Sequence, residues 1–405
     1  MKIGIRNIVP ITFFALIFIL PLFGGAPNNP KQEEILSLDN ISNLSKLFQK
    51  AVSDSAWPGG VLLASKDGDI FFHEAVGFHT YKKEVQTKVD DIFDLASVTK
   101  VIATTSAIMK LYEEGLIELD DPVQKHLPQF RGNPEKRKIT IRHLITHTSG
   151  LPPFKQYFFM DSNEETRIDS VLKTQSDYAP GDTTVYSDIG LISLGKLIEA
   201  VSGETLDDYV QKQIFLPLGM DDTGYNPSKE KLPRIVPTEI SLLNGNLIHG
   251  YVHDENSYSM GGVTGHAGLF STAEDLSKFS YMMLNKGMYN STKIYKPETV
   301  ELFTKRANIT VNSSRCLGWD SPSGRASGGV YLSDMSFGHT GYTGTSLWID
   351  PENKIVVILL TNAVHPHRSW KSPKYYQWRQ RIHSAVYEGL GFTEQNSNLE
   401  WIKEW

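Results

Sequence analysis

A serine and a lysine three residues apart, Ser97 and Lys100, have the types and spacing that nucleophilic chemistry needs. A serine hydroxyl is a weak nucleophile until a neighbouring group accepts its proton, and residues i and i+3 share a helical face, so the amine can reach the hydroxyl. The pair follows a short apolar segment ending at Leu95, where a helix N-terminus would favour a neutral lysine and a nearby oxyanion. The same Ser-x-x-Lys spacing recurs at Ser170, Ser193 and Ser228, so spacing alone does not identify a catalytic pair.

Two later segments supply other groups that a serine nucleophile requires. Tyr186 is the only one of the 17 tyrosines with an Asp or Asn two positions later, here Asp188, and a phenol can carry a proton. The segment 337–342, Phe-Gly-His-Thr-Gly-Tyr, directly precedes two predicted strands. A strand edge flanked by glycines lets the backbone approach a ligand and present an N–H. Three such signals in this order favour one shared site over coincidence.

The elements around these residues follow strand and helix patterns. Apolar runs on either side of the Lys66-Asp67-Gly68 turn predict a β-hairpin, and apolar residues three and four apart predict helices. We expect helices near residues 41–52, 101–112, 191–214, 273–286 and 374–389, and strands near 61–64, 70–72, 329–333, 346–350 and 354–361. Strands at both ends predict one sheet completed by both ends of the chain, with a helical lobe of about residues 100–290 inserted.

The composition excludes several classes of protein. Hydrophobic residues make up 40% of the chain and charged residues 21%, which is typical of a globular protein with a large core. The 40 Lys and Arg residues are outnumbered by 46 Asp and Glu, and no basic block stands out, so we expect no nucleic-acid partner. Cys316 is the single cysteine, which excludes an internal disulfide and a cysteine-based zinc or iron–sulfur site.

The N-terminus has the features of an export signal. Lys2 and Arg6 precede an almost wholly apolar run, 8–23, and the small residues 24–26 follow it. We therefore predict that residues 1–26 are a cleaved signal peptide, followed by a linker at 27–38, and that the protein is periplasmic or at the cell surface. The alternative is an uncleaved anchor, which would attach the chain to a membrane.

In order and spacing, these motifs resemble the penicillin-recognising serine hydrolases: class C β-lactamases, DD-peptidases and related esterases, with the pattern S-x-x-K, Y-x-N and K-T-G. The stretches 144–151 and 252–268 also resemble periplasmic carboxypeptidase-like penicillin-binding proteins. The resemblance covers roughly residues 40–390. It implies an α/β (α+β) fold of the β-lactamase/transpeptidase type, in which an antiparallel sheet is flanked by helices and joined to a mainly helical lobe. The catalytic domain would span 39–392, with a tail at 393–405.

The resemblance also implies a role for each matched residue. Ser97 would be the acylated nucleophile, Lys100 its partner, and Tyr186 a general base that later protonates the leaving group. The backbone N–H groups of Ser97 and Tyr342 would form the oxyanion hole. The residues expected to bind substrate are Asp188, His339, Thr340 and Gly341. No metal and no cofactor is implied.

Two positions depart from the family pattern. Asp188 stands where an Asn is more frequent, and an ionised carboxylate can only accept hydrogen bonds and favours a charged Lys100. His339 replaces the usual Lys, which would suit the carboxylate of a penicillin or a D-Ala terminus, whereas imidazole is shorter and largely neutral at pH 7. Both changes weaken a β-lactamase prediction more than a general acyl-transfer prediction.

We therefore predict an exported serine hydrolase acting on a D-Ala-type peptide or a small ester, with β-lactam hydrolysis less favoured. Its partner would be that peptide or small-molecule substrate, and the oligomeric state stays open. One alternative is a non-catalytic sensor that keeps the fold. Another is a metallohydrolase built on His143 and His147, although their H-x-x-x-H spacing lacks the glutamate of a zinc protease. We expect His253, Asp254 and His266 to hold a long loop by hydrogen bonds.

Overall fold

The computed structural model describes residues 38–371 and 373–402. The predicted signal peptide, 1–26, lies outside the described residues, as does the predicted linker except for Leu38, which opens the first helix. Among the described helices, none combines the length and the apolar character that crossing a bilayer requires.

A five-stranded antiparallel sheet, in the order β2-β1-β10-β9-β8, is formed by both ends of the chain. The strands are β1 (Gly59–Lys66), β2 (Asp69–Gly77), β8 (Phe337–Thr340), β9 (Ser346–Asp350) and β10 (Ile355–Thr361). The β10 strand lies between β1 and β9, with Val61 paired to Leu360 and Leu347 to Ile358. All seven residues of β10 are buried, as expected of a strand with both faces covered.

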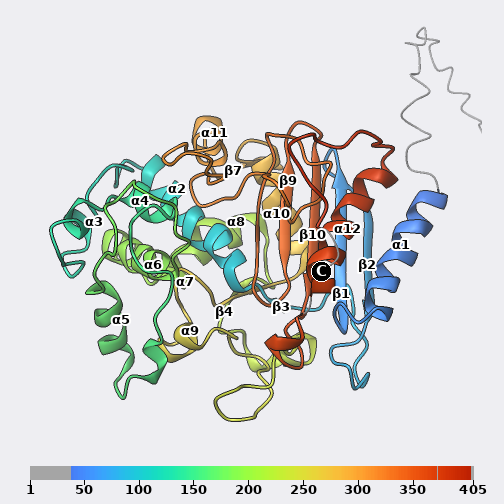
Figure 1. The fold of residues 1–405 in the computed structure, drawn as a ribbon, viewed down its shortest axis with the longest axis horizontal. Coiled ribbons are helices and arrows are strands. Elements are labelled where there is room, and N and C mark those ends of the chain that lie inside the picture. The colour runs from blue at the N-terminus through green and yellow to red at the C-terminus, as the bar shows by residue number, and fades with distance from the viewer. Residues whose placement is uncertain (1–37, 372, 403–405) are drawn as a thin grey trace, which may run out of the picture. The chain divides into compact units, whose positions relative to one another are not determined.

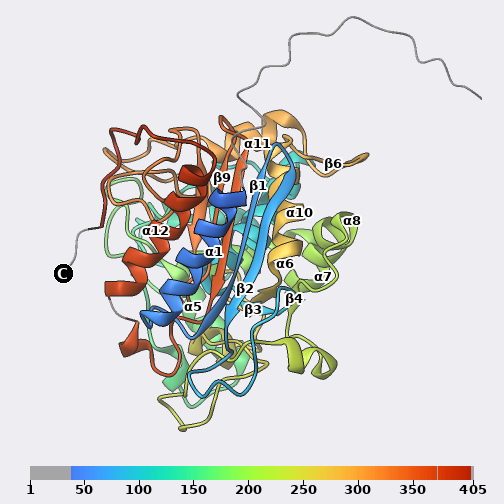
Figure 2. The same ribbon diagram turned by 90° about the vertical axis from the view of Figure 1, so that its right-hand side faces the viewer.

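Helices cover the two faces of this sheet (Figure 2). The first and last helices, α1 (Leu38–Ser53) and α12 (Pro373–Gly389), lie together on one face, and α10 (Ala273–Leu284) packs on the other against β1 and β10. The inward side of α1 is apolar at a helical spacing, with Leu44 and Phe48 buried, so this helix forms because its apolar side can be covered.

The helical region lies beside the sheet and is drawn in cyan to green in Figure 1. Its larger helices are α2 (Ser106–Glu113), α5 (Glu164–Leu172) and α6 (Asp188–Ser202). Shorter helices are α3 (Val123–His126), α4 (Ile141–Ile145), α7 (Leu206–Val210), α8 (Leu216–Leu218), α9 (Glu255–Ser259) and α11 (Pro297–Thr304). A small sheet of β3 (Phe93–Asp94), β5 (Leu269–Ser271) and β4 (Gly224–Tyr225) joins the two regions, and β6 (Met288–Tyr289) pairs with β7 (Thr292–Lys293).

The predicted hairpin and the sheet made by both chain ends are confirmed, and the inserted region is mainly helical. Within it, α10 packs on the sheet, and the helix predicted at 191–214 is interrupted after α6, where Gly203 has a φ of 74°. The strand predicted at 329–333 is wrong, and the strand before β9 is Phe337–Thr340 instead. The backbone of Val330 does not enter the ladder, because its N–H bonds to Ser384 Oγ at 3.2 Å and its carbonyl accepts from Asn396 N at 2.9 Å. The helix predicted at 101–112 begins as a wider π-helix, Lys100–Thr105, before α2.

Candidate active site

Ser97 lies in a single 3-10 turn, Ala96–Val98, which follows β3. Ala96 has a φ of 45°, a left-handed conformation that a residue with a side chain rarely adopts. The buried Asp94 stabilises this conformation, because its Oδ1 accepts a hydrogen bond from Ala96 N at 2.8 Å and its Oδ2 accepts one from His253 N at 2.7 Å. Local backbone strain next to a nucleophile is a feature of functional sites.

Lys100 is buried, with 1% of its surface exposed, and its ammonium has three oxygen partners. It donates to Ser97 Oγ at 2.7 Å and to the carbonyl of His266 at 2.9 Å, and it forms an ion pair with Asp188 Oδ1 at 2.8 Å. The sequence predicted that Lys100 reaches Ser97 and that Asp188 lies close to Lys100. The structure confirms both contacts.

Two opposing influences set the protonation of Lys100. Burial alone would lower its pKa, but the carboxylate of Asp188 and the hydroxyl of Tyr186 outweigh burial and raise the pKa above its ordinary value. Lys100 is therefore an ammonium ion at neutral pH. For Tyr186, burial dominates and raises the pKa, while the charge of Lys100 and hydrogen bonds with Lys100 and Ser97 oppose it.

Tyr186 lies between charged and aromatic neighbours just before α6. Its ring centroid lies 4.4 Å from that of His147 and 6.1 Å from that of His339. Lys100 Nζ is 4.9 Å from the ring centroid and the Arg315 guanidinium carbon is 5.1 Å from it. These four neighbours hold the phenol, which lines the same cleft as Ser97. The structure therefore brings Tyr186 and Ser97 together, and the role of Tyr186 as second proton carrier stays a prediction.

The turn after β8 is joined directly to the segment that precedes Ser97. The hydroxyl of Thr343 donates to the carbonyl of Asp94 at 2.8 Å, and that of Thr345 donates to the carbonyl of Leu95 at 3.0 Å. A Cβ on Gly341 would lie 2.0 Å from Thr345 Oγ1 and 2.3 Å from the Leu95 carbonyl, so only glycine permits this approach. Among the hydrogen bonds between described residues, none uses the N–H of Tyr342.

His339 is a neutral hydrogen-bonding group at the edge of the sheet. Its side chain is buried, and Nδ1 donates to the carbonyl of Thr340 at 2.8 Å, so Nε2 carries the lone pair. Burial lowers the pKa of His339 to about 3, with the charges of Arg315 and Lys100 adding to the effect. Nε2 has no hydrogen-bond partner among the described residues.

A network of histidines and carboxylates lies on another side of the site. His266 Nε2 bonds to Asp254 Oδ1 at 2.9 Å, and His253 Nε2 bonds to Glu239 Oε2 at 2.7 Å. The expectation that hydrogen bonds from His253 and His266 hold this loop is confirmed. Arg368 continues the network, because its Nε donates to Glu239 Oε2 at 2.8 Å.

These groups enclose a cleft of about 380 Å³. The residues that line it are Ala96, Ser97, Phe154, Tyr186, Asp188, His253, Asp254, Glu255, His266, Ala267, Tyr342 and Arg368. The sequence did not predict Phe154, Glu255 or Arg368 at the site. No motif or periodicity marks Phe154 or Arg368, since long-range packing brings them to Ser97. Glu255 lies in the 252–268 stretch that resembles penicillin-binding proteins, but the resemblance gave it no role.

The histidines considered for a metal site serve other purposes. His143 Nδ1 accepts from Thr140 N at 3.1 Å and closes a capping box at the start of α4, whereas His147 Nδ1 accepts from Ser187 N at 3.1 Å. In the described parts of the chain, three or more His, Cys, Asp or Glu residues nowhere gather in a metal-binding arrangement. Cys316 is buried, which raises the pKa of its thiol to about 12.

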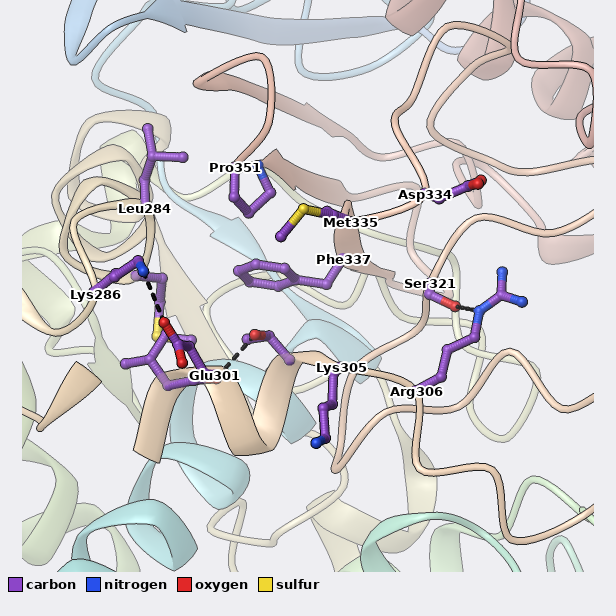
Figure 3. Close-up of a pocket in the computed structure, with 13 residues that line it drawn as sticks. Leu284, Lys286, Glu301, Lys305, Arg306, Ser321, Asp334, Met335, Phe337 and Pro351 are labelled. Carbon is purple, nitrogen blue, oxygen red and sulfur yellow. Dashed lines mark hydrogen bonds and ion pairs between the residues drawn. The ribbon is translucent and has the colours of Figure 1, made fainter. Parts of the chain in front are cut away.

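A second cavity, of about 370 Å³, lies between α10, α11 and the start of β8 (Figure 3). The ring of Phe337 points into it beneath Met335, and the polar side chains at its rim are partly paired, Lys286 with Glu301 at 2.7 Å and Arg306 with Ser321 at 2.7 Å. It shares no lining residue with the Ser97 cleft, so it is separate from the candidate active site.

Fold and site together define a serine hydrolase in which a Ser-x-x-Lys pair meets a tyrosine and the edge of an antiparallel sheet. The beta-lactamase family model matches residues 44–381, and the chain belongs to this family. The fold is of the β-lactamase/transpeptidase type, as the sequence motifs predicted.

Three known proteins illustrate the relationship. A protein of Salmonella typhimurium named "Putative D-alanyl-D-alanine carboxypeptidase" is 34% identical over 358 residues, which cover 79% of this chain and 82% of the relative. The octameric penicillin-binding protein homologue from Pyrococcus abyssi is 25% identical, with a TM-score of 0.65 over 82% of this chain and 75% of that one. EstCE1, a hydrolase with promiscuous acyltransferase activity, shares the fold at 20% identity and a TM-score of 0.68, over 86% of this chain and 99% of its own.

Proposed function

We propose that this serine hydrolase forms an acyl-enzyme on Ser97 and that its preferred substrate is a D-alanyl peptide. The contact of the Lys100 ammonium with Ser97 Oγ at 2.7 Å, held by Asp188 at 2.8 Å, supports the first part. The name of the 34% identical relative, "Putative D-alanyl-D-alanine carboxypeptidase", supports the second part.

The charge of Lys100 determines the proton route that we propose. An ammonium has three donors and no acceptor, and those of Lys100 face Ser97, Asp188 and the His266 carbonyl, so it cannot take the serine proton. Only the phenolate form of Tyr186, which the charge of Lys100 favours against burial, can accept that proton, and it does so as Ser97 Oγ bonds to the substrate carbonyl carbon. Tyr186 returns the proton to the leaving amine when the carbon–nitrogen bond breaks.

The second half of the cycle reverses these roles. A water molecule attacks the ester carbon, Tyr186 takes the water proton, and the proton passes to Ser97 Oγ as the ester bond breaks. The N–H groups of Ser97 and Tyr342 would stabilise the oxyanion in both halves, a contribution of about 3–4 kcal/mol for each donor. Asp188 lines the cleft and would position the substrate, whereas His339, Thr340 and Gly341, predicted for the same role, are not among the residues that line it.

Ester hydrolysis is a second candidate, and His339 favours it. The family pattern places a lysine at this position of the edge strand, where it suits a substrate carboxylate. His339 is instead a neutral acceptor, so β8 offers no cation. A small ester needs none.

A hydrolysis panel of p-nitrophenyl esters, D-Ala-D-Ala peptides and nitrocefin tests these proposals. The intact protein should turn over at least one class, and fluorophosphonate should label Ser97. In Ser97→Ala, labelling should disappear and turnover should fall by at least about 10³-fold, because the nucleophile is absent. Ser228→Ala, which alters another Ser-x-x-Lys pair, is the matched control.

Two results would contradict the proposal. Turnover that survives Ser97→Ala would show that the nucleophile lies elsewhere. One acylation of Ser97 without product release would favour the non-catalytic sensor that the sequence left as an alternative.

A further inference from the structure

The cations near the active-site cleft are already held by carboxylates of the protein. Arg368, which lines the cleft, donates through Nε to Glu239 at 2.8 Å and through Nη2 to Glu255 Oε1 at 2.5 Å. Lys100 is paired with Asp188 at 2.8 Å. A substrate carboxylate would have to displace one of these ion pairs, which lie in partly buried positions where breaking them is costly.

The remaining basic groups near the cleft add little positive charge. His339 is neutral, and its hydrogen bond to Thr340 leaves a lone pair on Nε2. Lys371 lies 4.6 Å from the ring centroid of Tyr342, and its ammonium donates to the Tyr342 carbonyl at 2.5 Å. Burial lowers the pKa of Lys371 to about 7, so it carries only part of a charge at neutral pH. Arg315 is paired with Asp320 at 2.9 Å.

Two neighbouring carboxylates keep an oxygen available in the cleft. Asp254 accepts hydrogen bonds through Oδ1 from His266 and Ser257, and Glu255 accepts through Oε1 from Arg368. Within the described part of the chain, nothing donates to Asp254 Oδ2 or Glu255 Oε2. The two side chains are 24% and 19% exposed, so both oxygens can meet a ligand.

Among the charged residues that line the cleft and the partners of their ion pairs, carboxylates outnumber cations. They are the carboxylates Asp188, Glu239, Asp254 and Glu255, and the cations Lys100 and Arg368. The four carboxylates outnumber these two cations. In a narrow, partly buried cleft such an excess attracts a cation and repels an anion more strongly than in open water.

We infer that the cleft selects an acyl donor that carries a protonated amino group, with Asp254 and Glu255 as its receptor. This inference rests on the proposed acyl transfer to Ser97 and narrows its substrate class. In a peptide, the amino group would belong to a free N-terminus or to a diamino acid on the acyl side. In an ester, it would belong to the acid portion.

Matched p-nitrophenyl esters test the inference on the intact protein, after subtraction of uncatalysed hydrolysis. D-alanyl is compared with isobutyryl, and 6-aminohexanoyl with heptanoyl, since each pair differs by an ammonium in place of a methyl group. We expect kcat/KM to favour the amino ester of at least one pair by about tenfold. Glu255→Gln should remove most of this preference, so that the ratio of kcat/KM for the amino and neutral esters falls towards one, whereas Glu274→Gln, 65% exposed on α10, should leave the ratio intact.

Other outcomes would overturn the inference. Equal kcat/KM within both pairs, or a preference for the neutral esters, would show that the cleft does not recognise an ammonium. A preference that survives both Glu255→Gln and Asp254→Asn would place recognition elsewhere. Labelling of Ser97 by fluorophosphonate separates these results from failure of the proposed function, because a protein without acyl transfer would be neither labelled nor active.

Discussion

The replacement of the usual asparagine by Asp188 has its main effect on the charge of Lys100. An amide at this position would leave burial as the main influence on the buried amine, and burial lowers the pKa of a lysine. The carboxylate reverses this balance and holds Lys100 as an ammonium. The division of labour follows: Lys100 orients Ser97 and stabilises negative charge, and Tyr186 moves the proton.

Asp188→Asn tests this division of labour. Without the carboxylate 2.8 Å away, the pKa of Lys100 should fall, because burial then loses its strongest opposing influence. The same carboxylate raises the pKa of Tyr186, the proposed proton acceptor, so its removal should also move down the pH at which Ser97 acylation reaches half its maximal rate. The measurement is the fluorophosphonate labelling rate between pH 5 and pH 10.

The matched control for this experiment is Asp182→Asn, an exposed carboxylate six residues earlier on the same segment. It should leave the pH profile of acylation unchanged. If Asp188→Asn also leaves the profile in place, the charge of Asp188 does not influence the group whose protonation limits acylation.

At the scale of elements, the site depends on the close approach of the β8–β9 turn to the segment between β3 and Ser97. The two hydroxyl-to-carbonyl bonds, from Thr343 to Asp94 and from Thr345 to Leu95, connect residues about 250 apart in sequence. They place Tyr342 N–H and Ser97 on facing elements, although neither bond involves a residue with a proposed chemical role. Gly341 allows the approach because it has no Cβ.

Gly341→Ala should therefore reduce activity more than stability. The added methyl group would lie 2.0 Å from Thr345 Oγ1 and 2.3 Å from the Leu95 carbonyl, which forces the turn away from Ser97. A displacement of about 1 Å at a catalytic centre lowers rates roughly 10²-fold. We expect a loss of that size in Ser97 acylation, measured beside the thermal unfolding midpoint.

Gly389→Ala at the end of α12 is the control, because a Cβ there has nothing within 4 Å. It should retain full acylation. Full acylation by Gly341→Ala would show that the turn does not position the oxyanion donor.

Elements that depend on neighbours in sequence could be predicted, and those that depend on distant partners could not. The β1–β2 hairpin, α12 and the Ser97–Lys100 contact follow from local spacing. Arg368 reaches Glu239 across 129 positions, and no local pattern signals that pairing. The 329–333 segment had a strand-like composition, but its backbone bonds to α12 and to the C-terminal segment.

At the scale of the whole molecule, α12 links the sheet to the C-terminal segment. His383 bonds to Ser346 of β9 at 2.8 Å, and Gln380 donates to the carbonyl of Glu400 at 2.8 Å. The helix α12, which follows the last strand, β10, therefore covers the sheet on the face that it shares with α1. Export and the cleavage of residues 1–26 stay predictions, because those residues lie outside the described part of the chain.

The burial of His383 predicts how the free energy of unfolding changes in acid. Burial lowers its pKa to about 3, with Arg379 adding to the effect, so the folded protein keeps His383 neutral where an unfolded histidine, with a pKa of about 6.5, takes up a proton. Above pH 6.5 both states are neutral and His383 has no effect. As pH falls from 6.5 towards 3, the unfolded state binds one more proton, so the free energy of unfolding decreases.

His383→Gln should flatten this dependence. Urea unfolding at intervals between pH 7 and pH 4 should give a slope smaller by up to about 1.4 kcal/mol per pH unit, the value for one proton. Ser346→Ala removes the same hydrogen bond and keeps the imidazole, so it should lower the free energy of unfolding while retaining the steep slope. If the slopes of His383→Gln and the unaltered protein coincide, protonation of this histidine does not limit stability in acid. The decrease in the free energy of unfolding must then come from other buried groups such as His339.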